Sequence, residues 1–257
     1  MTVEKRMPVL FVGHGSPMNA IEDNVFTREW RRIGGMLPRP RAILAVSAHW
    51  YGEGTRTSDA VHPRMVYDMY GFPRPLYEVK YSAPGSPELA ERVKALLPGT
   101  VTDNSWGIDH GTWSVLVHLF PDADIPVVQL SVDAYKSPQA HLELGRALTP
   151  LRDEGVLILG SGNVVHNLHL IGWNVPGGFP WADAFDQYIR GRIEAGDFAA
   201  VADYRSAGES AEKAFFTPDH YFPLLYALGA ADSTDSLTVF NDARIYGSIS
   251  MTGYLFQ

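Results

Sequence analysis

The chain contains 257 residues, 46% of them hydrophobic, and carries a formal net charge of −8. A chain of this length and apolar content can form one large α/β domain or two small ones, and wholesale disorder is excluded. Because cysteine is absent, disulfides, thiolate metal ligands and cysteine nucleophiles are excluded as well. Any bound metal must then use His, Asp or Glu, which are ligands suited to zinc or non-haem iron.

Charge and hydropathy also bear on partners and location. Arg28, Arg31 and Arg32 form the densest basic group, and we interpret it as the solvated face of a helix rather than a nucleic-acid surface. No apolar run approaches the roughly 18 residues typical of a transmembrane helix. The first residues lead directly into an apolar run without signal-peptide features. We therefore expect a cytoplasmic protein that binds neither nucleic acid nor membrane.

Apolar runs and helix-start signals alternate along the chain. Short aliphatic runs predict buried strands at 7–13, 42–48, 125–131, 156–160 and, more weakly, 237–240 and 245–251. Ser86-Pro87 and Ser137-Pro138 each resemble an N-cap followed by proline at the first helical position, and apolar residues then recur at helical spacing. Residues 181–194 and 219–229 also have helical patterns. The alternation predicts an α/β fold with a mainly parallel sheet.

Two stretches interrupt this alternation. Residues 51–85 are rich in Pro, Gly and Tyr, and residues 167–181 contain Trp173 and Trp181 among prolines and glycines. Loops of this length in a compact domain are usually functional, commonly as lids or pocket walls. Aromatic walls suit a flat, ring-shaped ligand. The alternative for any one of these aromatics is that it simply packs its loop onto the sheet.

Three histidines follow the predicted strands. His14 follows the first apolar run, His49 follows the second, and His166 follows 156–160 after a short segment of small residues. Ligands of parallel sheets bind outside the carboxyl ends of the strands, so we expect these imidazoles at one edge of the sheet, where they would form a metal site. Taken singly, each also fits an incidental or structural histidine.

Two further histidines lie at predicted helix starts. His110 follows Asp109 in a loop that leads into a helix, where acid–base chemistry or substrate binding competes with helix capping by Asp109 as the explanation. His220 follows Thr217-Pro218-Asp219, which resembles the cap and first turn of the last predicted helix. The remaining histidines are assigned structural, surface or peripheral positions: His62, His118, His141 and His169.

Five motifs occur in order along the chain: GHGSPMN at 13–19, SAHW at 47–50, WGIDHGTW at 106–113, SGNVVHNL at 161–168 and TPDHY at 217–221. Together they resemble the 4,5-DOPA extradiol dioxygenase family, which belongs to the class III ring-cleaving dioxygenases. Five ordered motifs are far more specific than any one of them. The resemblance implies an α/β fold, a single-domain αβα sandwich over residues 1–257 with a central, mainly parallel sheet and a metal site at the C-terminal edge of its strands.

The resemblance also implies roles for individual histidines. His14, His49 and His220 are the implied ligands of a mononuclear non-haem metal. His166 is the implied base beside the metal, and in zinc-loaded members of the family it is close enough to coordinate. His110 is the implied second acid–base histidine, pointing at the substrate or at oxygen.

The reaction implied by the resemblance inserts O2 into a catechol such as L-DOPA and gives a seco-DOPA-type semialdehyde. Iron(II) is the implied metal for activity, while zinc(II) can occupy the site in purified protein. Many members of the broader class have a carboxylate as third ligand, and a histidine there leaves the native metal open. The main alternative is a zinc-dependent hydrolase that uses the same histidines, and a third is a non-catalytic catechol- or metal-binding protein. The natural catechol, the 4,5- or 2,3-position of cleavage and the oligomeric state stay open.

Overall fold

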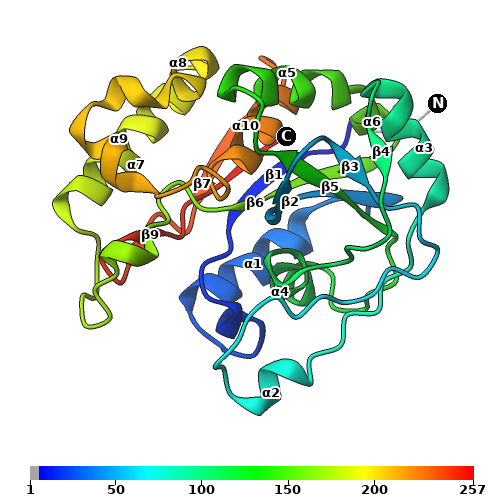
Figure 1. Cartoon of the computed structure of the whole chain (residues 1–257), viewed down its shortest axis with the longest axis horizontal. Coiled ribbons are helices and arrows are strands. Elements are labelled where there is room, and N and C mark those ends of the chain that lie inside the picture. The colour runs from blue at the N-terminus through cyan, green and yellow to red at the C-terminus, as the bar shows by residue number, and fades with distance from the viewer. Residues whose placement is uncertain (1–5) are drawn as a thin grey trace.

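The computed structural model describes residues 6–257 and is built on an eight-stranded sheet (Figure 1). Its strand order is β4-β3-β5-β2-β6-β1-β10-β7, and a separate two-stranded sheet pairs β8 with β9. In chain order the strands are β1 (Val9–Gly13), β2 (Ala42–Gly52), β3 (Arg56–Thr57), β4 (Val101–Thr102), β5 (Val127–Asp133), β6 (Val156–Gly162), β7 (Leu237–Phe240), β8 (Arg244–Ile245), β9 (Ile249–Ser250) and β10 (Gly253–Phe256).

The centre of the large sheet is parallel, as the sequence predicts. Strands β5, β2, β6 and β1 all run in the same direction, with Leu44 of β2 opposite Ile158 of β6 and Leu10 of β1 opposite Leu159 of β6. Antiparallel strands flank this centre: β10 pairs with β1, β7 pairs with β10, and β3 pairs with β5. The carboxyl ends of the four central strands therefore meet at one edge of the sheet.

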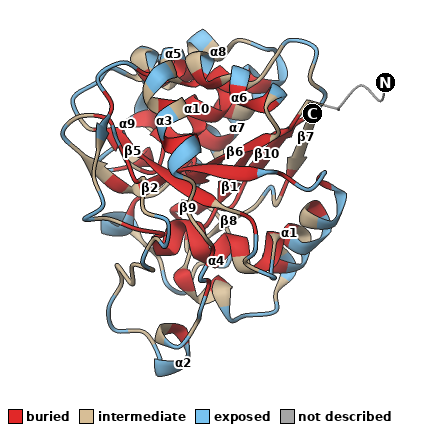
Figure 2. Ribbon diagram, turned by 90° about the vertical axis from the view of Figure 1, so that its right-hand side faces the viewer, coloured by how far each residue is buried: buried red, intermediate tan, exposed pale blue. Residues whose placement is uncertain are grey.

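Helices cover both faces of the sheet, which gives the predicted αβα sandwich (Figure 2). Helices α1 and α4 pack on one face, and α5 and α10 pack on the other. The helices are α1 (Val25–Met36), α2 (Arg74–Tyr77), α3 (Pro87–Leu96), α4 (His110–Leu119), α5 (Pro138–Leu148), α6 (Pro150–Asp153), α7 (Pro180–Glu194), α8 (Phe198–Ala202), α9 (Glu209–Ala214) and α10 (Phe222–Ala230), with 3₁₀ turns at Pro17–Ala20, Leu168–Leu170 and Tyr204–Ala207.

The apolar runs that were predicted to be strands are buried on both faces of the sheet. Successive side chains of a strand point to opposite sides of the sheet, and helices cover both sides. Val9 and Phe11 of β1 pack under α5 and α10, whereas Leu10 and Val12 pack against α1 and α4. All four side chains are fully buried.

The two serines predicted to be N-caps have that role. The Ser86 hydroxyl accepts a hydrogen bond from a backbone N–H of α3, and the Ser137 hydroxyl accepts one from a backbone N–H of α5.

The structure corrects the bounds of several predicted elements. The expected strand at 245–251 is instead a short hairpin of β8 and β9 that turns through Tyr246 and Gly247, both with positive φ. The strand that enters the sheet here is β10, which the sequence analysis did not predict. The helix expected at 219–229 begins only at Phe222. The helix that the sequence places after Ser137 ends at Leu148, and Pro150 starts the separate short helix α6.

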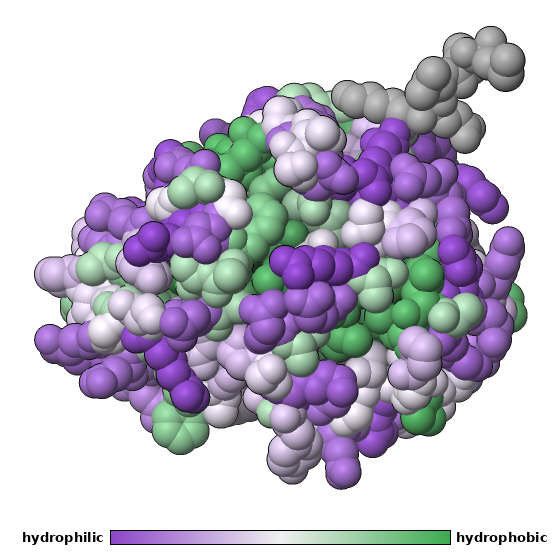
Figure 3. Space-filling model, turned by 90° about the horizontal axis from the view of Figure 1, so that it is seen from above, coloured by the Kyte–Doolittle hydropathy of each residue, from purple (hydrophilic) through white to green (hydrophobic). Residues whose placement is uncertain are grey.

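The outer surface of the sandwich is mixed in character. Seen from above in Figure 3, hydrophilic side chains surround and separate the hydrophobic areas of this face. Within residues 6–257, none of the helices combines the length and the apolar character needed to cross a membrane.

Candidate metal centre

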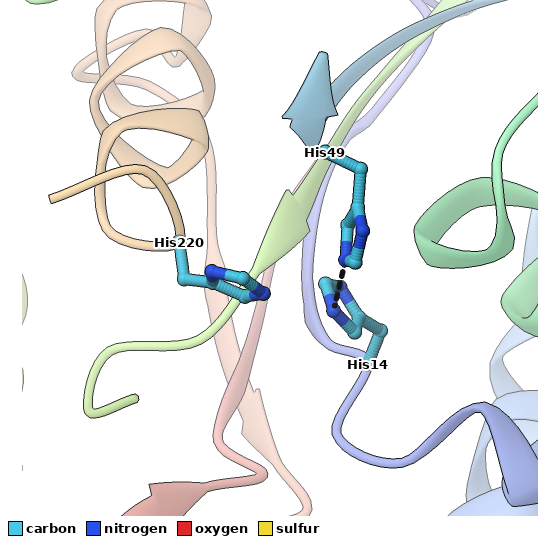
Figure 4. Close-up of side chains that lie close together, drawn as sticks. All are labelled: His14, His49 and His220. Atoms are coloured by element: carbon cyan, nitrogen blue, oxygen red, sulfur yellow. Dashed lines mark hydrogen bonds between the residues drawn. The ribbon is translucent and has the colours of Figure 1, made fainter. Parts of the chain in front are cut away.

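Three histidines from distant parts of the chain point toward one another at the carboxyl edge of the sheet (Figure 4). His14 follows β1 directly, His49 lies near the end of β2, and His220 lies just before α10. One ligand atom from each of these side chains lies within 4.8 Å of the others. The prediction that strand ends bring histidines together here is confirmed for His14 and His49, and the third member of the converging group is His220.

An irregularity in β2 determines where His49 lies. The predicted strand 42–48 continues to Gly52, but its pairing with β5 changes register between Val46 and Tyr51. Residues 47–50 of β2 therefore lie opposite the single residue Ser131 of β5. Extra residues of this kind bend a strand and redirect its side chains, and His49 is one of the redirected residues.

The backbone packs tightly around these histidines, and two glycines make this possible. A Cβ atom on Gly162, the last residue of β6, would lie 2.0 Å from the carbonyl oxygen of His220. A Cβ atom on Gly111, in the first turn of α4, would lie 2.9 Å from Cδ2 of His49. Side chains larger than hydrogen at these positions would displace the histidines.

Each of the three imidazoles has an acceptor at its Nδ1 atom. His14 Nδ1 lies 3.0 Å from the Ser161 hydroxyl, which donates its own proton to the Gly111 carbonyl and therefore accepts from His14. His49 Nδ1 lies 2.7 Å from Oδ2 of Asp68, and His220 Nδ1 lies 3.1 Å from Oδ2 of Asp219. In the neutral rings the lone pair is then on Nε2, which is the arrangement typical of metal-binding histidines.

The Nε2 atoms of His14 and His49 approach to 3.2 Å. Two lone pairs at this distance repel each other unless a proton or a cation lies between them. Burial first, and then the neighbouring histidines, hold the pKa of His14 well below its usual value. Burial also acts to lower the pKa of His49, but its hydrogen bond to Asp68 and the nearby carboxylates raise it, so a proton shared between the two rings belongs to His49. A proton on His49 Nε2 satisfies this contact when no metal is bound, and a cation that replaces the proton would find three imidazole nitrogens, donors that suit zinc or iron(II).

Carboxylates stand behind two of the three histidines. Burial acts to raise the pKa of Asp219, but its hydrogen bonds to His220 and Thr217 lower it to about 2. Burial likewise opposes ionisation of Asp68, yet its hydrogen bonds to His110 and His49 hold its pKa well below the usual range. A three-histidine centre has no charged ligand of its own. These two carboxylates supply negative charge through their hydrogen bonds to the Nδ1 atoms of His49 and His220.

Asp68 is a residue of the site that was not predicted from the sequence. This residue lies in the irregular segment between β3 and α2, and its carboxylate bridges His49 and His110. His49, Asp68 and His110 form a second group of potential ligand atoms beside the first. The available signal was that Asp68 is the only charged residue between Arg64 and Arg74, within an otherwise apolar and aromatic stretch.

His110 is the first residue of α4, as expected, and Asp109 caps that helix by accepting from the Thr112 N–H. The ring centroid of His110 lies 3.9 Å from that of His49 and 5.9 Å from that of His14. Burial, followed by the charge of His49, lowers the pKa of His110. The Asp109 carboxylate is fully buried and also accepts from Ser47 and Gln129, so it ties α4 to β2 and β5.

His166 lies on the other side of His220. The two rings are stacked, with centroids 3.5 Å apart and planes 9° from parallel. The backbone of His166 pairs with Phe215 and Ile249, which fixes its position beyond the end of β6. Burial, and then the charge of His220, hold the pKa of His166 well below its usual value. His166 is not a member of either converging group within residues 6–257.

The other histidines lie elsewhere. His62 is exposed, and His169 contacts Phe216 in the turn at Leu168–Leu170. His118 is buried and hydrogen-bonded to the Asn19 carbonyl, and His141 is buried beside Tyr226.

The fold and the site define an α/β protein with a histidine centre able to hold a metal, flanked by two further histidines, His110 and His166. Over residues 8–257 the sequence matches the family described as "Catalytic LigB subunit of aromatic ring-opening dioxygenase". The chain belongs to this family of enzymes. The resemblance stated from the five motifs is thereby confirmed.

Relatives of known name and structure agree with this assignment. The chain is 46% identical to "4,5-DOPA dioxygenase extradiol" of Escherichia coli (strain K12), over 96% of this chain and 93% of that protein. It is 39% identical to the protein of the same name from Beta vulgaris, over 96% and 95% of the two chains. The crystal structure of an uncharacterized Escherichia coli K12 protein superimposes with a TM-score of 0.85 at 42% identity, covering 98% of this chain and 100% of that one.

Proposed function

We propose that this protein is an extradiol dioxygenase that inserts O2 into a catechol such as L-DOPA and opens its ring to a seco-DOPA-type semialdehyde. The observation that carries this proposal is the convergence of His14, His49 and His220 in a chain of the ring-opening dioxygenase family, with His110 and His166 on either side. Relatives that match nearly the whole chain are named 4,5-DOPA dioxygenase extradiol, which supports L-DOPA as the first substrate to test.

His14, His49 and His220 would hold the metal through their Nε2 atoms, because their Nδ1 atoms are already engaged by Ser161, Asp68 and Asp219. Iron(II) is the metal proposed for activity, and zinc(II) fits the same donors. When bound, iron(II) supplies positions for both catechol oxygens and for O2 and allows electrons to pass between them.

His166 is proposed as the base that takes a proton from a catechol hydroxyl. The imidazole is neutral at neutral pH and so has a lone pair to accept a proton, and its place against His220 puts it beside a substrate bound at the metal. Among the described residues, the converging ligand atoms come from His14, His49 and His220, and this supports a role for His166 as base rather than as fourth ligand.

His110 is proposed as the second acid–base group. Its Nδ1–H is donated to Asp68 at 2.9 Å, which leaves Nε2 free to accept a hydrogen bond or a proton. Aromatic side chains back this side of the site: the Trp113 ring lies 6.5 Å from that of His110, and the Tyr67 ring lies 5.6 Å from that of Trp113. Of these two rings Trp113 is fully buried, whereas Tyr67 is partly exposed, and an aromatic face there suits a planar substrate.

Product analysis tests the proposal. Protein stripped of metal and reconstituted anaerobically with iron(II) is mixed with L-DOPA under O2, and the product is examined by absorbance and mass spectrometry. We expect a yellow semialdehyde whose mass exceeds that of the substrate by both atoms of O2, or its cyclised form that has lost one water. If L-DOPA and a panel of simple catechols are recovered unchanged despite confirmed iron loading, the proposal is refuted and the zinc-hydrolase alternative becomes the hypothesis to test.

A further inference from the structure

Asp68 contacts two groups to which the proposed function gives separate roles, a metal ligand and an acid–base histidine. Its Oδ2 atom accepts from His49 Nδ1 at 2.7 Å, and its Oδ1 atom accepts from His110 Nδ1 at 2.9 Å. Oδ1 also accepts from the backbone N–H of His110 at 3.0 Å. Within residues 6–257, every hydrogen bond of this carboxylate goes to one of these two histidines.

These contacts determine the tautomers of both rings. A neutral imidazole carries one N–H, and a carboxylate can only accept, so each ring must place its proton on Nδ1. Each Nε2 then carries a lone pair. For His49 this is the atom that faces His14 at 3.2 Å, and it is the atom that a metal ligand must present. One carboxylate thus sets the tautomer of a ligand and of its neighbour together.

The segment around Asp68 is held in place by its own hydrogen bonds. Backbone bonds of 2.8 Å join Val66 N–H to the Ile108 carbonyl and Ile108 N–H to the Arg64 carbonyl. On the helix side, the Trp113 indole N–H donates to the Val66 carbonyl at 2.9 Å. Asp68 therefore projects from a braced segment, and its carboxylate is positioned before any ligand binds.

The negative charge of Asp68 lies next to the histidine centre and, among residues 6–257, is not neutralised by a basic side chain. In the described part of the chain, no Lys or Arg pairs with this carboxylate, whose side chain is only 14% exposed. A buried carboxylate without a basic partner is stabilised only by its hydrogen-bond donors and by nearby positive charge. A metal cation on His49 would supply that positive charge.

We propose that Asp68 is a positioning residue that holds His49 and His110 in their Nδ1–H tautomers and in one relative orientation, so that the metal ligand and the acid–base group are set by a single carboxylate. This inference rests on the proposed function, because it assumes that His49 binds the metal. Its test does not require turnover, so the two can fail separately.

The test uses zinc-loaded protein, in which the imidazole ¹⁵N resonances report the tautomer of each histidine. The variant is Asp68→Asn, which keeps the size of the side chain but offers one acceptor oxygen in place of two. Asp59→Asn is the matched control, because Asp59 lies in the same loop and its carboxylate bonds the Asn104 side chain rather than a histidine. Zinc affinity is measured on all three proteins by competition with a chelator.

We expect wild-type protein to show Nδ1–H at both His49 and His110. In Asp68→Asn at least one of the two rings should populate the Nε2–H tautomer, and zinc affinity should fall by about 10- to 100-fold, as for other partners of metal-binding histidines. The Asp59→Asn control should retain the wild-type tautomers and affinity. A purely structural role for Asp68 would lower stability without changing either readout.

Three results would overturn the inference. One is an Nε2–H tautomer at His110 in the wild-type protein, which is decisive even if Asp68→Asn fails to fold. Another is a folded Asp68→Asn variant with unchanged tautomers and zinc affinity. The third is wild-type protein that binds neither zinc nor iron(II), which would refute the proposed function too. Zinc binding with the expected tautomers but no catechol turnover with iron(II) would refute only the proposed function.

Discussion

Gly162→Ala is predicted to disable the metal centre without touching a histidine. The added Cβ atom would lie 2.0 Å from the His220 carbonyl oxygen, whereas real Cβ atoms essentially never approach below 3.0 Å, so the two backbones must separate by about 1 Å. That carbonyl accepts from the Asn163 N–H at 2.8 Å, so the same movement strains the bond that places His220 beside β6.

The cost should appear in both stability and function. Overpacking of this kind typically costs about 1–3 kcal/mol in the free energy of unfolding. A displacement of about 1 Å at a catalytic group can reduce turnover by about 100-fold. Urea unfolding, zinc affinity and O2 uptake with iron(II) and a catechol would be compared with those of the wild type.

Gly191→Ala is the matched control for this experiment. Gly191 lies on the exposed side of α7, and a Cβ atom there meets nothing within 4 Å. Alanine is a better helix former than glycine, so this variant should gain up to about 1 kcal/mol and keep full zinc affinity. Wild-type zinc affinity and turnover in a folded Gly162→Ala protein would refute the view that β6 positions His220.

Three further predictions concern the site and the fold. His49→Ala should abolish metal binding, whereas His110→Ala should retain metal and lose turnover; full iron occupancy in His49→Ala, measured by metal analysis, would contradict the ligand assignment. Asp235→Ala should cost about 3–5 kcal/mol in urea unfolding, because it leaves the guanidinium of Arg152, 1% exposed, without its bidentate partner; a loss below about 1 kcal/mol would contradict this. Burial lowers the pKa of His141 to about 4, although the nearby Asp133 acts to raise it. As the pH drops from 6.5 toward 4 the unfolded chain takes up a proton at this histidine before the folded protein does. The free energy of unfolding should therefore fall by up to about 3 kcal/mol over this range. His141→Phe should show a shallower decline over this range, and an unchanged pH profile would refute the assignment.

The parts of the site that the sequence could predict are those that follow regular strands. Apolar runs before His14 and His49 place both residues at the carboxyl edge of a parallel sheet, because period and burial are visible in the sequence. His220 follows no strand, and its membership of the site came from the resemblance rather than from its own surroundings. Its place depends on how α10 packs across β6, which is a tertiary contact.

Asp68 and the irregular end of β2 show what the sequence leaves open. Asp68 lies in a long irregular segment, and only tertiary hydrogen bonds bring it to His49 and His110. The extra residues at 47–50 depend on pairing with β5, which a single strand does not reveal. β10 was missed for a similar reason, because four residues after a turn carry little periodic signal.

Oxygen uptake is the most direct test of the central claim, which is that these histidines form the iron centre of a catechol-cleaving dioxygenase. Protein reconstituted anaerobically with iron(II) is added to L-DOPA in an oxygen electrode, with zinc-loaded protein as the control. The account predicts one O2 consumed for each L-DOPA lost with iron(II), and none with zinc(II), which is redox-inert. No uptake by protein with confirmed iron loading, for L-DOPA and for a panel of catechols, would contradict it.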